Sequence, residues 1–195
     1  MSAETTGVAS GRPRDPRIDS AVLDAAAELL VDVGYRKLTM AAIADRAGTT
    51  KTALYRRWSG KAELVHDVAF SRMARLPPSR GAVEADLRIM VAAARDLFAS
   101  PVTRAALPGL ISDMAAEPEL AARVHAGFAD VFGALRDRLV VAVERGEVHP
   151  DVDPDRLIEA VGGAAMLHAL LLDDREFDTA WADQLSALVV HGVLR

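Results

Sequence analysis

The sequence contains no cysteine among its 195 residues, and aromatic residues make up only 5% of it. Without cysteine the chain can form no disulfide bond, thiolate nucleophile or cysteine-ligated zinc site. With so few aromatic rings, its core must consist mostly of leucine, valine, alanine and isoleucine. Hydrophobic residues reach 51% and charged residues 26%, a balance typical of globular chains with a packed core.

Long apolar runs and targeting signals are also missing. Spanning a bilayer takes about 18 or more consecutive apolar residues, and the longest weakly polar stretch, 160–172, is shorter and carries His168. No secretory signal pattern is found near the N-terminus. We therefore expect a soluble, cytoplasmic protein without a membrane partner.

Motifs for catalysis and metal binding are absent as well. The histidines form no His-x-x-x-His pair, and there is no pair of Glu-x-x-His motifs such as a di-metal site needs. There is also no Gly-x-Ser-x-Gly sequence and no glycine loop that could hold a phosphate. We expect no metal site, no cofactor and no enzymatic activity.

Charge is distributed unevenly along the chain. Residues 1–75 carry a net charge of +3 and residues 76–195 carry −8, which together make the −5 of the whole chain. A basic first part and an acidic second part indicate two modules with different partners. The alternative is that the acidic surface only keeps the second module in solution.

Apolar residues recur every three or four positions along most of the chain, and no useful stretch alternates with a period of two. This periodicity predicts an all-α fold. Residues 1–17, rich in serine, threonine, glycine and proline, are expected to form a flexible arm because they lack apolar anchors. We expect helices at about 19–33, 40–47, 51–58, 61–76, 83–98, 118–143, 154–172 and 178–194, with a shorter, irregular helical segment at 101–116.

The most informative segment is 39–61, where two short helical patterns flank the turn Gly48-Thr49-Thr50. From Arg46 to Lys61, both included, there are five basic residues and no acidic one, although the whole chain is acidic. A short helix pair with a basic second member is typical of a helix-turn-helix, which lays its second helix in a DNA groove. The sequence therefore predicts a DNA-binding domain over 18–62.

The face of the second helix that lies opposite its internal residues, Leu54 and Trp58, is expected to read DNA. Lys51 or Arg56 could bind guanine in the major groove, and Tyr55 could reach a phosphate. Threonines that cap the two helices, and flanking cations, would supply further phosphate contacts. The predicted contact residues of this domain are Thr39, Thr49, Thr50, Lys51, Thr52, Tyr55, Arg56, Arg57 and Lys61.

The arm adds two candidate contacts, Arg12 and Arg14, in the sequence Gly-Arg-Pro-Arg. Extended arginines of this kind fit a narrow minor groove. The alternative is a disordered, solubilising tail. Cations on a short helix are also commonly just solvated, and Thr39 and Thr50 could serve only as helix caps. It is the gathering of these residues on one face, opposite a core stripe, that favours DNA binding.

The last two predicted helices are apolar around most of their circumference. A helix that is apolar on more than one face must bury more than one face. An antiparallel helix pair from each of two subunits would form a four-helix interface, and Gly162-Gly163-Ala164-Ala165 would permit a close approach of helices. We therefore expect a homodimer formed through these helices. The alternative is that both helices are internal to one subunit.

Residues 47–64, Ala-Gly-Thr-Thr-Lys-Thr-Ala-Leu-Tyr-Arg-Arg-Trp-Ser-Gly-Lys-Ala-Glu-Leu, closely resemble the signature of TetR-type bacterial transcriptional regulators. That signature has an Ala-Gly turn, a capping Ser or Thr, Leu-Tyr, an aromatic residue and then Lys-x-x-Leu. The resemblance extends over about 18–70. Three residues depart from it: Thr49 replaces a common valine, Ala53 replaces a phosphate-binding hydroxyl, and Gly60 replaces the usual cap of the next helix.

The resemblance implies a homodimeric repressor that binds a double-stranded, palindromic operator and is released by an unknown small molecule. In such a protein, residues 63–195 would form a helical domain for ligand binding and dimerisation. The ligand would move the helix that follows the recognition helix, so that the two recognition helices no longer lie one DNA turn, roughly 34 Å, apart. A ligand-independent activator or an architectural DNA binder is the alternative.

The large apolar side chains of the second domain are candidates for the ligand pocket, although ordinary core packing would also explain each of them. His168 in particular could be a hydrogen-bonded core histidine. The pocket candidates are Met90, Phe98, Leu107, Ile111, Met114, Phe128, Phe132, Met166, His168 and Trp181.

Overall fold

The computed structural model describes residues 16–70, 79, 81–172 and 177–194. These ranges are almost entirely helical, and the one β-type contact within them is an isolated antiparallel bridge between Val148 and Leu194. The prediction of an all-α fold is confirmed. The helices are α1 (Pro16–Lys37), α2 (Met40–Arg46), α3 (Lys51–Tyr55), α4 (Lys61–Phe70), α5 (Val83–Ala99), α6 (Pro101–Ala116), α7 (Pro118–Glu144), α8 (Pro154–Leu171) and α9 (Thr179–Val193).

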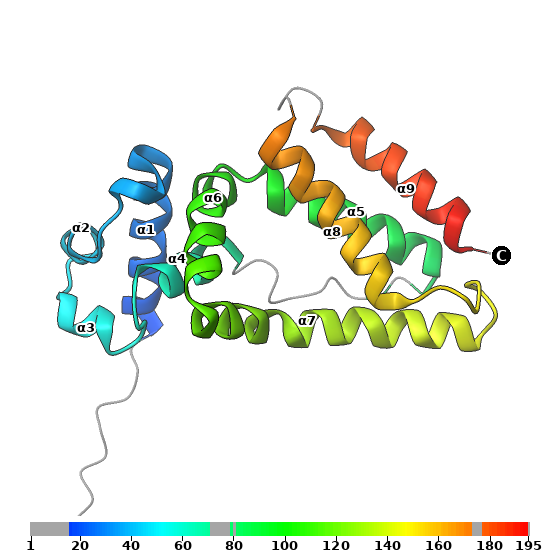
Figure 1. Cartoon of the computed structure of the whole chain (residues 1–195), viewed down its shortest axis with the longest axis horizontal. Helices are drawn as coiled ribbons and strands as arrows, with labels where there is room; N and C mark the ends of the chain where they lie inside the picture. The colour runs from blue at the N-terminus through cyan, green and yellow to red at the C-terminus, as the bar shows by residue number, and fades with distance from the viewer. Residues whose placement is uncertain (1–15, 71–78, 80, 173–176, 195) are drawn as a thin grey trace, which may run out of the picture.

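The helices form two groups (Figure 1). The short helices α2 and α3 lie against α1 at one end of the molecule, and α5, α7, α8 and α9 form the larger group at the other end. Helices α4 and α6 lie between the two groups, and each of them contacts α1 as well as α7. Any movement in the larger group can therefore reach the small helices through α4 or α6.

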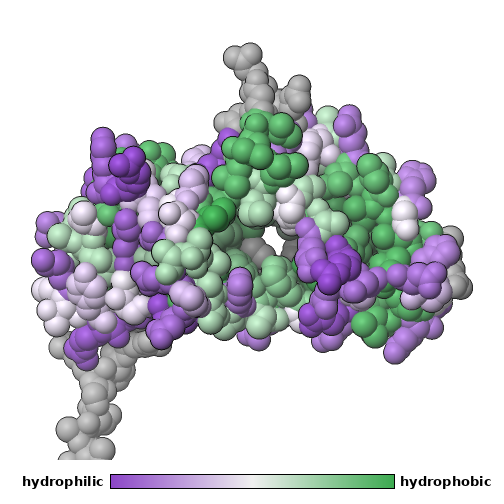
Figure 2. All heavy atoms as spheres, in the orientation of Figure 1, coloured by the Kyte–Doolittle hydropathy of each residue, from purple (hydrophilic) through white to green (hydrophobic). Residues whose placement is uncertain are grey.

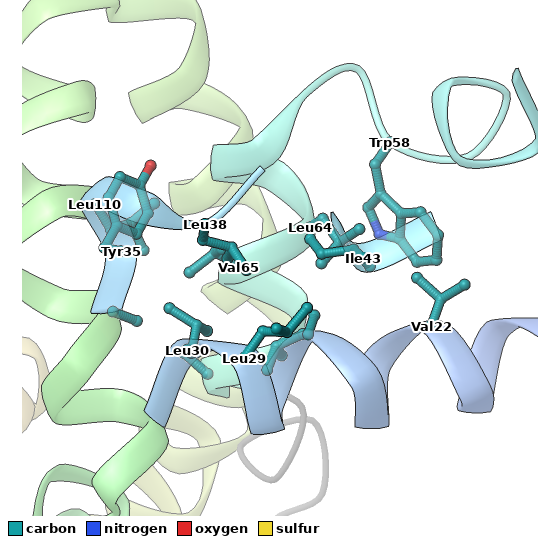
Figure 3. Close-up of a cluster of buried hydrophobic side chains, with 14 of the residues drawn as sticks. Val22, Leu29, Leu30, Tyr35, Leu38, Ile43, Trp58, Leu64, Val65 and Leu110 are labelled. Carbon is teal, nitrogen blue, oxygen red and sulfur yellow. The ribbon is translucent and has the colours of Figure 1, made fainter. Parts of the chain in front are cut away.

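One hydrophobic core holds the N-terminal helices together and continues into α6. Val22 of α1, Ile43 of α2 and Leu54 of α3 are completely buried in it, and Trp58 packs over this cluster at 6% exposure (Figure 3). Leu110 of α6 belongs to the same core. The core therefore extends beyond the helix-turn-helix, and the boundary at 62/63 between two domains stays a prediction.

Local chemistry explains where these helices begin and end. The side chains of Thr39 and Thr50 cap α2 and α3, each accepting a hydrogen bond from a backbone N–H three residues on, at 3.1 and 3.2 Å. Gly34 interrupts α1 with φ at 74°, a left-handed conformation that glycine adopts without strain. At the start of α4, Glu63 accepts hydrogen bonds from the backbone N–H and the hydroxyl of Ser59, which hold the preceding turn against the first turn of the helix.

One expected helix boundary and one expected irregular segment were wrong. The recognition helix α3 ends at Tyr55 and not at Trp58, because the next residues form a tight turn in which the Trp58 N–H still bonds to the Leu54 carbonyl, at 2.9 Å. The segment expected to be irregular is a continuous helix, α6, with Pro108 inside it. Burial of Ala106, Leu107 and Leu110 compensates for the hydrogen bond that Pro108 cannot donate.

A second core joins α5, α7, α8 and α9. Leu87 and Val91 of α5 are almost completely buried there, as is Val161 of α8. Val189 and Val190 of α9 face inward into the same core. No helix in the described ranges is both long enough and apolar enough to cross a bilayer.

Candidate DNA-binding face and ligand cavity

The recognition helix α3 presents one buried and one exposed face. Leu54 is fully buried, whereas Lys51, Thr52, Tyr55 and Arg56 on the other side are exposed, Tyr55 at 55%. The helical period accounts for residues 52, 55 and 56, which are three and four positions apart and so share a face away from Leu54, and Lys51 is exposed as the first residue of the helix. The structure therefore brings together the four residues predicted to face the major groove.

Thr39 and Thr50 are also exposed, at the first turns of α2 and α3. Their hydroxyl oxygens accept the capping bonds, so each hydroxyl hydrogen can still be donated to a phosphate oxygen. Thr49 is half-buried, and its backbone N–H bonds to the Ala44 carbonyl at 2.9 Å. Arg12 and Arg14 lie outside the described residues.

Two predicted phosphate contacts, Arg57 and Lys61, face neighbouring helices. The Arg57 guanidinium forms an ion pair with Asp19 of α1, and its side chain is only 17% exposed. The Lys61 ammonium donates to the Tyr35 carbonyl at 3.2 Å and lies 4.1 Å from the centroid of the Tyr35 ring. In this arrangement both cations connect α1 to the elements that follow it, and their contact with phosphate stays a prediction.

Asp67 of α4 connects that helix to the residue that closes the turn after α3. Its carboxylate accepts a hydrogen bond from the Trp58 indole N–H at 2.8 Å and lies 3.3 Å from Nδ1 of His66. Burial by itself raises the pKa of Asp67, but the hydrogen bonds from His66 and Trp58 outweigh it and hold that pKa below its usual value.

A cavity of about 1110 Å³ lies among α1 and α4–α8. Figure 2 shows a hollow between α6, α7 and α8, with apolar side chains around much of its edge and hydrophilic ones toward the start of α8. Eight of the predicted pocket residues line the cavity: Met90, Phe98, Leu107, Ile111, Met114, Phe128, Phe132 and Met166.

The other two pocket candidates, His168 and Trp181, do not line this cavity. His168 is 4% exposed and stacks on Phe177 with 4.5 Å between ring centroids, while Trp181 meets both rings edge-on. His168 of α8 and Trp181 of α9 thus meet around Phe177, away from the residues that line the cavity, and their contact with a ligand stays a prediction. The interpretation of His168 as a core histidine fits its burial.

Sequence reasoning missed two parts of the cavity wall. Phe70, the last residue of α4, lines it, so the helix next to the recognition helix contacts the same space as α5–α8. A charged rim was also missed. It consists of Arg136, which donates two hydrogen bonds to Asp155 at 2.9 and 2.6 Å, and Arg156, which donates to Glu159 at 2.5 Å. The i,i+3 spacing of Arg156 and Glu159 was the one available signal for this rim.

An apolar surface remains uncovered at the C-terminal end of α8 and on α9. Leu167 and Leu188 are 53% and 73% exposed, and Leu171 is 73% exposed. A methyl group added to Gly162 or Gly163 would meet no atom within 4 Å. The exposed residues of this surface are Met166, Leu167, Leu170, Leu171, Leu172 and Leu188.

Metal binding finds no candidate site in the part of the chain that the structure describes. No three histidine or acidic side chains there are grouped so that they could hold an ion.

An exposed recognition helix and a separate cavity are together the architecture of a DNA-binding regulator.

Comparison with known families places the chain within one of them. Residues 22–68 match the family described as bacterial regulatory proteins, tetR family, and residues 77–189 match the tetracyclin repressor-like C-terminal domain. The protein belongs to the TetR family of transcriptional regulators. The predicted resemblance is confirmed, and a family of regulators agrees with the absence of catalytic motifs.

Curated relatives and solved structures agree with this assignment. The DNA-binding transcriptional repressor TetR of Mycobacteroides abscessus is 34% identical over 176 residues, 85% of this chain and 86% of its own. The transcriptional activator FasR of Mycolicibacterium smegmatis is 50% identical over 52 residues, 27% of this chain and 23% of its own. The fatty acid degradation regulator FadR of Bacillus halodurans has the same fold, with a TM-score of 0.66 at 19% identity, over 92% of this chain and 97% of its own.

Proposed function

We propose that the protein is a homodimeric repressor that binds a palindromic operator and is released from it by a small molecule. The observation that carries this proposal is the 1110 Å³ cavity, because its wall includes Phe70 of α4 and α4 is bonded through Asp67 to Trp58. A molecule in the cavity can therefore act on the element that carries the recognition helix. The site of action would be the bacterial cytoplasm, where the operator lies.

The exposed face of α3 supplies the proposed base contacts. Arg56 or Lys51 would bind guanine in the major groove, and Tyr55 and Thr52 would contact the backbone or base edges. Thr39 and Thr50 would donate to phosphates at the first turns of α2 and α3. Ala53, which is half-buried and has no hydroxyl, offers no such contact.

The uncovered apolar surface of α8 and α9 supports dimerisation through these helices. Gly163, Leu167 and Leu170 fall on one face of α8, because they are four and three residues apart. Glycine within a helix costs about 1 kcal/mol relative to alanine, and the single subunit has no close contact at Gly163 that would require it. A helix of a second subunit, lying close at this point, would account for the glycine and cover the leucines.

The cavity supports a ligand with a large apolar body and one polar end. Apolar side chains, including four phenylalanines and three methionines, line much of the interior, and the ion pairs of Arg136 and Arg156 lie at one edge. A polar group of the ligand could exchange with Asp155 or Glu159 as partner of these arginines at little cost, since both pairs are about half exposed to solvent or more.

The alternative function, a ligand-independent activator or architectural protein, has one observation in its favour. FasR, with 50% identity over 52 residues, is an activator by name. A DNA titration with candidate ligands and a transcription assay together separate the two proposals. Duplexes selected from a random pool by the native protein are titrated against it with and without a library of apolar metabolites. Loss of the complex with one compound supports the repressor, whereas a complex that no compound releases, together with raised transcription from a promoter carrying the site, supports the alternative.

A further inference from the structure

Two glycines in the described ranges pack so closely against another side chain that a methyl group would not fit. A Cβ atom on Gly109 of α6 would overlap the Tyr35 ring, and one on Gly127 of α7 would lie 2.9 Å from Cε1 of His66. At these two places a side chain of α1 or α4 lies directly against the backbone of α6 or α7.

His66 is part of a continuous aromatic cluster that leads into the cavity. Its ring lies 5.2 Å from the Phe128 ring and 5.3 Å from the Phe70 ring, measured between centroids. Phe70 and Phe128 meet edge to face at 5.1 Å, and Phe128 stacks on Phe132 at 5.5 Å. All three phenylalanines line the cavity. A ligand that displaces Phe128 or Phe132 must therefore displace the atoms against which His66 packs.

On its other side His66 is connected to the recognition helix. Nδ1 of His66 lies 3.3 Å from one carboxylate oxygen of Asp67, and the other oxygen accepts the Trp58 indole N–H at 2.8 Å. The backbone N–H of Trp58 in turn bonds to the carbonyl of Leu54, within α3. Tyr35 makes different polar contacts, because its hydroxyl donates to Asp113 of α6 and its carbonyl accepts from Lys61 at the start of α4.

We infer that His66 is the positioning residue through which the contents of the cavity act on the recognition helix, in the order Phe128, His66, Asp67, Trp58, α3. This inference rests on the proposed function. The backbone of α7 at Gly127 leaves the His66 ring no room on that side, so a displaced Phe128 drives the ring and α4 away from α7. Asp67 then moves relative to Trp58, and α3 changes its orientation toward DNA.

The test introduces the displacement without a ligand. Gly127→Ala places a methyl group against His66, whereas Gly133→Ala, in the same helix, adds a methyl group that meets no atom within 4 Å. Both changes raise helix propensity equally, so any difference in behaviour between the two variants reports the contact of the new methyl group with His66. The chain has two tryptophans, and Trp181→Phe leaves Trp58 as the one fluorescent reporter, in a background that keeps an aromatic ring at position 181.

In that background we expect Gly127→Ala to shift the Trp58 emission and to weaken binding of the selected duplex about tenfold, within the roughly 5- to 150-fold range of allosteric couplings. Gly133→Ala should change neither. If Gly127→Ala and Gly133→Ala give the same emission and the same affinity, the inference is wrong. If the native protein selects no sequence from the pool, the proposed function fails, and the Trp58 emission still reports whether the contact exists.

A second variant keeps the test valid if Gly127→Ala folds poorly. His66→Asn shortens the side chain so that it no longer reaches the methyl group, while its amide can still donate to Asp67. We expect the double variant Gly127→Ala/His66→Asn to match His66→Asn alone in DNA affinity, that is, the two effects to be non-additive. Additive losses would refute the inference, and Gly133→Ala/His66→Asn is the matched additive control.

Discussion

Arg56 and Arg57, adjacent at the end of the recognition helix, are expected to differ in what their removal weakens: DNA binding for Arg56 and folding stability for Arg57. Arg56 is exposed on the face of α3 that we assign to DNA, whereas Arg57 is ion-paired with Asp19 of α1. Arg56→Ala should therefore cost about 1–3 kcal/mol of specific DNA binding and leave the free energy of unfolding unchanged within about 0.5 kcal/mol.

Arg57→Ala should act mainly on folding. The side chains of Arg57 and Asp19 are 17% and 32% exposed, so the loss should fall between the ~0–1 kcal/mol of an exposed pair and the 3–5 kcal/mol lost when one partner of a buried pair is removed, about 2 kcal/mol. For a chain of this size that corresponds to a fall in Tm of roughly 4–8 °C. DNA affinity should decrease less than in Arg56→Ala.

Thermal unfolding and salt-dependent DNA titration of both variants check these values. A contact between Arg57 and phosphate would flatten the dependence of affinity on salt by about one unit of slope. If Arg57→Ala has the native Tm and a flattened slope, the ion pair with Asp19 gives way to phosphate in the complex and our reasoning fails. If Arg56→Ala weakens binding to selected and random duplexes equally, Arg56 does not read bases.

The remaining predictions concern the dimer, pH and the contact between α1 and α6. Leu188→Glu should yield monomers in sedimentation with an unchanged Tm of the subunit, whereas Val189→Glu should unfold it, because Val189 is buried. Burial and the hydrogen bond to Asp113 raise the pKa of Tyr35, so its contribution to stability is present below pH ~10 and lost as the pH rises above that; Tyr35→Phe should remove this loss while costing about 0.5–1.5 kcal/mol at neutral pH. The pKa of Asp67 is lowered, so its ionised carboxylate stabilises the fold above pH ~4, and this contribution is lost as the pH falls below that value. Asp67→Asn should therefore flatten the acid limb of a denaturation curve.

Much of this protein was predictable from local patterns. The helical period alone places Thr52, Tyr55 and Arg56 on one face of the recognition helix and Leu54 with Trp58 on another, because side chains three to four residues apart share a face. The caps at Thr39 and Thr50 are local as well. Eight of the ten pocket candidates line the cavity. Large apolar side chains of a helical domain tend to face its interior, and in this domain the interior includes the cavity.

Other features required knowledge of which helix lies beside which. Arg57 and Lys61 look like phosphate ligands in the sequence, but Asp19 and Tyr35, distant along the chain, are close enough to engage them. Val189 and Leu188 are neighbours of equal hydrophobicity, and only the packing of α9 decides that one is buried and the other exposed. Pro108 suggested a break, but the burial of its neighbours maintains α6.

The sequence by itself determined the all-α class, the helix-turn-helix at 39–61, its exposed basic face and the family, because each depends on residues within a few turns of one another. Only the tertiary structure decided that His168 packs against Phe177 and Trp181, that Phe70 lines the cavity, and that Gly127 lies directly against His66. These contacts join residues of different elements, and their energies depend on distances of a few tenths of an ångström that no local pattern records.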